Sequence, residues 1–273
     1  MKLAFSTNAF RKYSIEQSIE IIAKAGYSAI ELMCDTPHAF PPLSTKQLVS
    51  IQNSLFENKI GISNLNGFMM CAVGDFHHPS WIEDDPNRRQ QRINHTTNCI
   101  ELAKRLGAKT VSTEPGGPLV NITAEKGFAI FKEGLNQVIP IAEKNQIKLL
   151  VEPEPSLLIE NSSQFLKFIS NFNTKYLGLN FDVGHFFCVN EDPAILIKSL
   201  KDHISHVHLE DIAGNRVHQH LIPGKGVINF VEIFKALDSI GYDGFVTVEL
   251  YPYENNPEQA ARSAIEYLRN MIC

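Results

Sequence analysis

Short apolar runs alternate with longer amphipathic segments along the chain. The eight short runs are nearly continuous in hydrophobicity, which is typical of parallel strands buried on both faces. They occupy residues 3–6, 28–32, 61–66, 109–114, 148–152, 177–182, 204–210 and 245–250. Each run is followed by a segment whose apolar residues recur at helical spacing. These eight segments occupy residues 14–27, 44–59, 91–108, 123–146, 162–172, 192–203, 229–242 and 257–271.

The ends of several helical segments carry residues suited to helix termini. Side chains that accept a hydrogen bond from a first-turn amide stand at four starts: Ser14, Ser44, Thr123 and Asp192. Glycines, which tolerate a positive φ, stand at three ends: Gly26, Gly107 and Gly241. Pro140 lies inside the fourth segment, where we expect a kink or a break because proline cannot donate a helical hydrogen bond.

The alternation predicts a (β/α)8 TIM barrel. Eight strand–helix units of roughly 30–35 residues match the average unit of that fold. An open, doubly wound sheet is the alternative, but no linker rich in proline, glycine or serine divides the chain, which favours closure. We therefore expect one α/β domain spanning residues 1–273.

Composition narrows the function classes. Hydrophobic residues make up 44% of the 273, enough for a substantial core. Lys and Arg number 25 against 30 Asp and Glu, and this net charge of −5 disfavours a protein that grips nucleic acid through its phosphates. No apolar run is long enough to span a membrane, and the start does not read as a secretory signal. Five scattered cysteines indicate reduced thiols and a cytoplasmic protein: Cys34, Cys71, Cys99, Cys188 and Cys273.

Polar side chains end most of the apolar runs. They are Glu31, Asn64, Asn66, Glu114, Glu152, Asp182, His208 and Glu249. In a barrel, the carboxyl ends of the strands form the active site. Alone, Glu31 is as readily a solvated or capping group as a functional one. Several carboxylates at one mouth would repel each other unless a cation or a proton intervened. Three carboxylates and one imidazole from the last four runs suit Mn²⁺, Mg²⁺, Co²⁺ or Zn²⁺.

Histidines gather in the same part of the chain. Six of the ten lie between positions 185 and 220. His185 follows the sixth run closely enough to reach the mouth, and His218 and His220 alternate along a loop, so both point the same way. His206 should lie deeper, packed in the barrel or behind a ligand. Two others are expected at the surface: His38 and His95.

Motifs of other enzyme classes are weak or missing. The G-K-G at Gly224 lacks the rest of a phosphate-binding loop and is better interpreted as a turn. The sequence has neither a G-x-S-x-G elbow nor a G-x-G-x-x-G after the first run. Serine hydrolase and dinucleotide-dependent dehydrogenase functions therefore have no support.

Four motifs together carry a family resemblance. They are E-P after the fifth run, D-x-G-H after the sixth, H-x-H-L-x-D at the seventh and V-E-L at the eighth. With them, essentially the whole chain resembles the xylose isomerase-like TIM-barrel superfamily. That superfamily includes sugar isomerases and epimerases of the tagatose 3-epimerase type, inosose and dehydroshikimate dehydratases, and class II apurinic endonucleases.

The resemblance implies one divalent metal held by Glu152, Asp182, His208 and Glu249. In the epimerases, the two glutamates also face opposite sides of the sugar, so Glu152 and Glu249 are the implied acid/base pair. The metal polarises the carbonyl and its neighbouring hydroxyl, which stabilises a cis-enediolate. Glu154 competes for the position of Glu152, which we prefer because it ends the apolar run directly.

The resemblance also extends to the multi-zinc endonucleases. His185, His218 and His220 match positions that those enzymes use for an additional metal, and Glu114 falls on the strand where they carry a histidine. These four are candidates for a second metal or for substrate. Asn66 replaces a ligand of the endonucleases and is expected to contact substrate.

Three functions remain open. The first is a metal-dependent isomerase or epimerase of a small sugar, polyol or sugar-like ketone. The second is a metal-dependent dehydratase of the inosose or dehydroshikimate type. The third is a multi-metal phosphoesterase of the endonuclease IV type. A small-molecule substrate is expected in the first two, and a homo-oligomer is left open.

Overall fold

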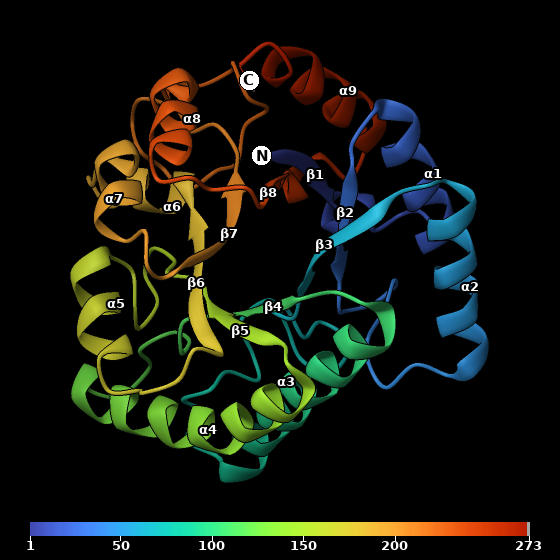
Figure 1. Cartoon of the computed structure of the whole chain (residues 1–273). Coiled ribbons are helices and arrows are strands. Elements are labelled where there is room, and N and C mark those ends of the chain that lie inside the picture. The colour runs from blue at the N-terminus through green and yellow to red at the C-terminus, as the bar shows by residue number, and fades with distance from the viewer. Residues whose placement is uncertain (272–273) are drawn as a thin grey trace.

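Eight parallel strands close into a barrel in sequence order, with β8 pairing back to β1 (Figure 1). The strands are β1 (Lys2–Ser6), β2 (Ala29–Met33), β3 (Gly61–Asn66), β4 (Thr110–Thr113), β5 (Lys148–Val151), β6 (Leu177–Asp182), β7 (Ile204–Leu209) and β8 (Phe245–Val248). This computed structural model describes residues 1–271, so Cys273 lies outside the described residues. The predicted (β/α)8 fold is confirmed, and the open-sheet alternative is wrong.

Helices form an outer ring around the strands (Figure 1). They are α1 (Ile15–Ala25), α2 (Thr45–Glu57), α3 (Pro86–Leu106), α4 (Ala124–Asn145), α5 (Ser162–Ile169), α6 (Val183–Cys188), α7 (Pro193–Ser199), α8 (Phe230–Ser239) and α9 (Pro257–Leu268). Two 3-10 turns follow β1 and β8: η1 (Thr7–Phe10) and η2 (Tyr251–Tyr253). Over the described part of the chain, no helix combines the length and apolarity needed to cross a membrane.

Local signals in the sequence explain most helix boundaries. The four predicted N-cap side chains each accept an amide hydrogen bond from the first turn of their helix. The three predicted glycines at helix ends all adopt a positive φ. Pro140 does not break α4, which continues to Asn145. Both Pro140 and Asn136, whose carbonyl loses its partner, are exposed, so water can satisfy that carbonyl.

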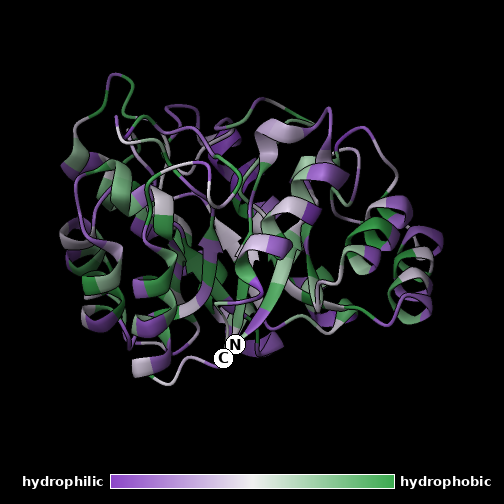
Figure 2. Cartoon of the chain, turned by 90° about the horizontal axis from the view of Figure 1, so that it is seen from above, coloured by the Kyte–Doolittle hydropathy of each residue, from purple (hydrophilic) through white to green (hydrophobic). Residues whose placement is uncertain are grey.

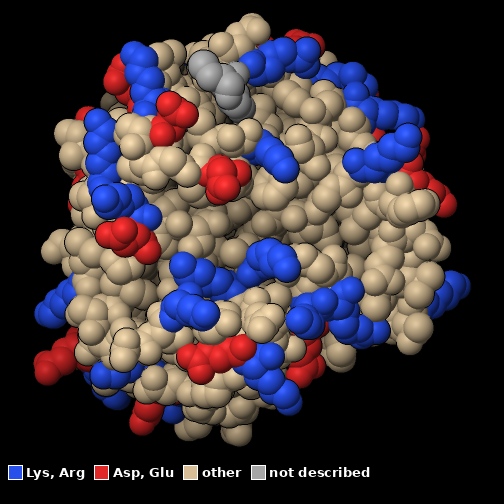
Figure 3. All heavy atoms as spheres, viewed as in Figure 1, with Lys and Arg blue, Asp and Glu red and all other residues tan. Residues whose placement is uncertain are grey.

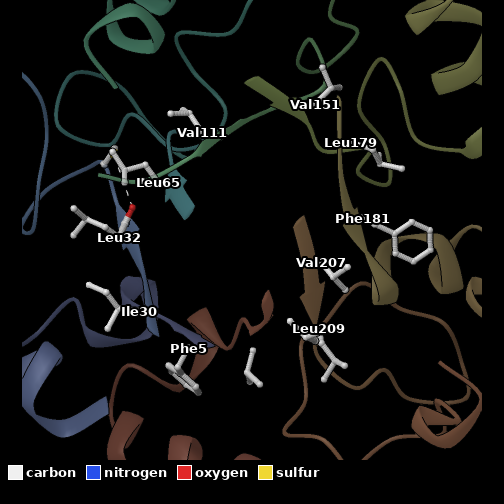
Figure 4. Packing of buried hydrophobic residues seen from close by; sticks show 14 of the residues in the cluster. Phe5, Ile30, Leu32, Leu65, Val111, Val151, Leu179, Phe181, Val207 and Leu209 are labelled. Atoms are coloured by element: carbon white, nitrogen blue, oxygen red, sulfur yellow. Dashed lines mark hydrogen bonds between the residues drawn. The ribbon is translucent and has the colours of Figure 1, made fainter. Parts of the chain in front are cut away.

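The main apolar core lies between the strands and the helices. Figure 4 shows strand side chains such as Phe5, Leu32 and Phe181 on the outer side of the ring of strands, facing the helices. Figure 2 shows the same arrangement from the side, with hydrophobic residues gathered inside and hydrophilic ones outside. The outward-facing apolar residues thus fix each strand in place and leave its other face to line the barrel.

The barrel interior is unusually polar. Barrels of this kind are normally filled by branched apolar side chains. Here Glu31, Asn64, Asn180 and His208 are all completely buried. The amino-terminus lies at the amino ends of the strands (Figure 2), an end that carries charges of both signs around its rim (Figure 3). The buried polar side chains lie instead toward the opposite end of the barrel, at the carboxyl ends of the strands, which we call the mouth.

Candidate active site

Four side chains from the last four strands meet at the mouth. Each of Glu152, Asp182, His208 and Glu249 offers a ligand atom, and these atoms all lie within 4.8 Å of one another. His208 Nδ1 is 2.7 Å from Glu152 Oε1, 3.7 Å from Glu249 Oε2 and 3.8 Å from Asp182 Oδ2. The structure therefore brings together the whole set that the resemblance implied for one metal.

The buried oxygens of this group fit a cation. Asp182 Oδ1 accepts the amide hydrogen of His185 at 2.7 Å and so caps α6, while Asp182 Oδ2 has no hydrogen-bond partner among the described residues. Glu152 Oε2 likewise has none there. Unpartnered buried carboxylate oxygens are costly, and a divalent cation would satisfy both.

The carboxylates and the imidazole shift one another's proton affinity. Although burial opposes it, the negative charges of Glu152 and Glu31 hold the pKa of His208 well above its usual range. Burial, with the Glu152 charge nearby, raises the pKa of Glu249 well above the ordinary glutamate value. Without a metal, a charged imidazole therefore compensates part of the negative charge at the mouth.

Glu31 is a central part of the site rather than a solvated group. It lies within β2, two residues before the strand ends, and has no exposed surface. Its Oε2 is 2.6 Å from Nε2 of His208, on the side of the ring away from the other carboxylates. The solvated interpretation of Glu31 is therefore wrong.

His185, His218 and His220 form a second group, again with ligand atoms within 4.8 Å of one another. His185 Nδ1 donates to the carbonyl of Pro153 at 2.9 Å, and His220 Nδ1 donates to that of Glu249 at 2.9 Å. Because a carbonyl can only accept, Nδ1 of each ring carries the hydrogen of this contact. Burial lowers the pKa of His218 to about 3 and that of His220 to about 4, so both rings are neutral at ordinary pH.

Glu114 lies apart from this histidine group. It is completely buried, 3.4 Å from Nε of Arg92, and it accepts the amide hydrogen of Trp81 at 3.2 Å. Burial, opposed by Arg92, raises the pKa of Glu114 to about 8. Among the described residues, Glu114 joins none of the groups that could hold a metal.

Asn66 reaches the cavity at the mouth. It donates to Glu249 Oε1 at 3.2 Å and to Glu31 Oε1 at 3.3 Å. Asn8 of η1, for which no role was predicted, donates to the same Glu249 oxygen at 2.8 Å. Asparagine at position 8 follows no motif, so only the folded barrel reveals its contact.

The cavity has two unlike walls. Its volume is about 20 Å³, room for a single water-sized group. The polar wall consists of Asn8, Asn66, Glu152, Glu154, His185, His218, His220 and Glu249, and the apolar wall of Phe68, Met69, Phe76 and Tyr251. Among these described lining residues there is no Lys or Arg. Phe68, Met69 and Phe76 lie in the loop after β3 and Tyr251 lies in η2, segments without hydrophobic periodicity, so no sequence pattern predicted this wall.

Two histidines expected at the surface are instead buried. His38 is 5% exposed and its Nε2 lies 3.1 Å from the carbonyl of Phe10. His95 is 3% exposed and stacks on Phe40, with ring centroids 5.1 Å apart. The expectation was wrong because neither position follows an apolar pattern, although each ring has a specific partner.

The loop containing G-K-G is a turn, as predicted. It wraps around the carboxylate of Asp211, which accepts amide hydrogens from Gly224, Gly226 and Ile228 at 2.8–3.0 Å. These amides are therefore already occupied and cannot also bind a phosphate.

A sequence profile of the family described as "Xylose isomerase-like TIM barrel" matches residues 19–271, so the chain belongs to that family. The fructoselysine 3-epimerase of Shigella flexneri is 26% identical over 284 aligned positions, covering 100% of this chain and 98% of that protein. An inosose dehydratase of Clostridium beijerinckii is 28% identical over 163 positions, covering 53% of this chain and 55% of the dehydratase. The chain thus matches about half of that dehydratase.

Solved structures share the fold over the whole chain. A D-tagatose 3-epimerase-like protein superposes with a TM-score of 0.83 at 24% identity, covering 99% of this chain and 97% of its own. The IOLI protein, solved with a zinc atom, superposes with a TM-score of 0.81 at 21% identity, covering 100% and 98%. At these identities the likeness concerns the barrel itself.

Proposed function

We propose that this protein is a divalent-metal-dependent isomerase or epimerase of a small, uncharged sugar, polyol or sugar-like ketone. The observation that carries the proposal is the convergence of Glu152, Asp182, His208 and Glu249 beside a cavity at the mouth. The family membership and the epimerases among the relatives support the reaction class.

The four-residue group would hold the metal through three carboxylates and Nδ1 of His208. This mixed oxygen and nitrogen set suits Mn²⁺, Mg²⁺, Co²⁺ or Zn²⁺. When bound, the cation would draw electron density from the substrate carbonyl and its neighbouring hydroxyl, lowering the energy of an enediolate.

Glu152 and Glu249 would move the proton next to the carbonyl. They follow β5 and β8, which are not neighbours in the barrel, so their carboxylates approach the cavity from different directions. Asn8 and Asn66 both donate to Oε1 of Glu249 and fix that oxygen. One glutamate would remove the proton and the other would return one. In an epimerase this inverts the configuration of the carbon, and in an isomerase it moves the carbonyl group.

The lining of the cavity favours an uncharged substrate. Its polar wall offers carboxylates and neutral histidines, with no described Lys or Arg to pair with a phosphate or a carboxylate. Arg92, which is completely buried, donates to the carbonyls of Pro79, Gly67 and Phe68 and is not directed at the cavity. A phosphosugar, a dehydroshikimate or a phosphodiester would add negative charge to an acidic site.

A dehydratase acting on an uncharged cyclic ketone is the second candidate, and Glu154 favours it. Glu154 lines the cavity, and burial, with the Glu152 charge nearby, raises its pKa well above the ordinary glutamate value. A protonated carboxyl group beside the substrate could protonate a departing hydroxyl after the first proton is removed. The inosose dehydratase among the relatives is consistent with this reaction.

Deuterium exchange tests both candidates. The protein is incubated with Mn²⁺ in D₂O together with ketoses and cyclic polyol ketones, and deuterium next to the carbonyl is measured by NMR. Exchange with retention of all hydroxyls indicates an isomerase or epimerase, whereas loss of a hydroxyl indicates a dehydratase. Glu249→Gln should lower the rate by roughly 10²–10⁴, the usual effect of losing a general base.

Two controls accompany the exchange assay. Glu266→Gln makes the same chemical change at an exposed position of α9 and should exchange like the wild type. A phosphodiester is offered in parallel. Cleavage of the phosphodiester without exchange in any ketone would replace the proposal with the phosphoesterase alternative.

A further inference from the structure

We propose that Glu31 is a positioning residue for His208: it accepts the Nε2–H of the imidazole and so directs the Nδ1 lone pair at the metal-binding carboxylates. This inference rests on the proposed metal site. Glu31 is a buried carboxylate that lies across the barrel from that site and is not among its four implied ligands.

The geometry distinguishes the two nitrogens of His208. Nε2 lies 2.6 Å from Glu31 Oε2, and Nδ1 lies 2.7 Å from Glu152 Oε1. Both Glu31 and His208 are completely buried, and they come from β2 and β7, which do not pair with each other. The ring is thus held at both ends by carboxylates, only one of which belongs to the proposed metal site.

Glu31 is itself held firmly. Asn64 Nδ2 donates to Glu31 Oε2 at 2.9 Å, and Asn66 Nδ2 lies 3.3 Å from Glu31 Oε1. His206 Nε2 lies 3.4 Å from Oε2. Both oxygens therefore have neighbouring donors, and the carboxylate cannot rotate away from His208 without losing them.

These same contacts argue against Glu31 as a metal ligand. Glu31, His206 and His208 lie close enough together to form a cation site of their own. However, amide hydrogens of Asn64 and Asn66 point at the Glu31 oxygens, and a cation there would face those donors. Accepting hydrogen bonds suits Glu31 better than coordinating an ion.

The need for such a residue follows from imidazole chemistry. A neutral histidine has two tautomers, and only the one protonated at Nε2 can coordinate a metal through Nδ1. A carboxylate that accepts the other ring hydrogen selects this tautomer and fixes the plane of the ring. Without Glu31, a proton on Nδ1 could remain hydrogen-bonded to Glu152 and compete with the cation.

Metal affinity tests the inference independently of turnover. Dissociation constants for Zn²⁺ and Mn²⁺ are measured by competition with a chromophoric chelator for the wild type, Glu31→Ala and Glu31→Gln. Loss of a hydrogen-bonding partner behind a ligand histidine typically weakens metal binding by about 10–100-fold. We expect Glu31→Ala to show this weakening, and Glu31→Gln to show less because its amide oxygen can still accept from Nε2.

Nitrogen NMR supplies a second readout, because the nitrogen shifts show which ring nitrogen of His208 carries the hydrogen. In the Zn²⁺-loaded wild type, we expect a hydrogen on Nε2 of His208 that exchanges slowly with water, and none on Nδ1. In Glu31→Ala that hydrogen should exchange faster. His95→Gln removes a different buried ring, far from the four-residue group in the sequence and on α3, and should lower thermal stability without changing metal affinity.

The outcomes separate the inference from the proposed function. If the wild type binds no divalent metal, or His208→Ala binds it equally well, the proposed metal site is wrong. If the wild type binds metal and folded Glu31→Ala binds it with the same affinity, only the assignment to Glu31 is overturned. Should Glu31→Ala not fold, a loaded wild type with Nε2 unprotonated would overturn it directly.

Discussion

Asn8 Nδ2 lies 2.8 Å from Oε1 of Glu249 and thereby links the first turn after β1 to the residue that follows β8. The contact fixes one oxygen of Glu249, while the other oxygen, Oε2, lies 3.7 Å from His208 Nδ1. Asn8 is thus placed to orient a candidate base without itself belonging to the metal-binding group.

Asn8→Ala should therefore slow deuterium exchange more than it weakens metal binding. A lost hydrogen bond to a charged group costs about 1.5–3 kcal/mol, which corresponds to roughly 10–150-fold in rate if the bond is fully used in the transition state. The exchange rate and the Mn²⁺ dissociation constant are measured on the same preparation. An equal loss in both would mean that Asn8 supports the metal site rather than the base.

Asp182→Asn and His208→Ala should each abolish most metal binding. Each change removes a ligand whose immediate neighbours along the chain are apolar and cannot coordinate a cation: Phe181 and Val183 for Asp182, and Val207 and Leu209 for His208. Elemental analysis of protein purified without chelator gives the metal content. His203→Ala, just before β7, is the matched control, since this half-buried ring belongs to none of the groups that could hold a metal among the described residues. Unchanged metal content in both ligand variants would refute the assignment.

The strand ends explain why so much of the site could be predicted. Glu152 and Glu249 directly follow β5 and β8, and Asp182 ends β6, so the fold alone brings them to one mouth. Hydrophobic runs and helix caps are local signals, and they were sufficient to predict closure once eight units were counted.

Contacts across the barrel could not be predicted in this way. Glu31 and His208 are 177 positions apart in the sequence, and their contact depends on the diameter of the barrel and the register of its strands. The prediction that His95 lies at the surface was wrong for a related reason. It lies on α3, whose buried face also contains Arg92 and Thr96, so no apolar pattern identifies that face as the inner one.

The neutral histidines at the mouth should make stability depend on pH in the metal-free protein. The pKa of His220 is lowered to about 4 by burial, so between pH 6.5 and 4 the unfolded chain binds a proton that the folded chain does not. Stability present above the unfolded pKa is therefore lost as the pH falls through this window. For a single buried histidine with a shift of this size, the loss is about 3 kcal/mol.

Comparison with His220→Asn isolates this contribution from those of the carboxylates. Urea unfolding is measured at several pH values with a chelator present, and we expect a shallower decline in the variant than in the wild type. His203→Asn changes the same chemical group outside the cluster, at a half-buried ring that packs on Phe165, and should leave the slope unaltered. Parallel curves for the wild type and His220→Asn would contradict the assignment of a neutral buried ring.

The apolar wall of the cavity should determine substrate affinity rather than the rate of proton transfer. Phe76, from the loop after β3, and Tyr251 of η2 pack together at a tilt, with ring centroids 5.7 Å apart. Both rings line the cavity at the mouth, so we expect them to pack against the C–H face of a bound sugar. Phe76→Ala removes one ring and should raise KM about tenfold, the equivalent of roughly 1.4 kcal/mol of lost aromatic contact, with a smaller change in kcat. Steady-state exchange kinetics on the best ketone measure both constants.

Phe56→Ala on α2, where the side chain is 84% exposed, deletes the same group outside the cavity and should leave both constants unchanged. If Phe76→Ala instead lowered kcat with KM unaltered, the loop would act in the chemical step, since the ring would then stabilise the transition state more than the bound substrate.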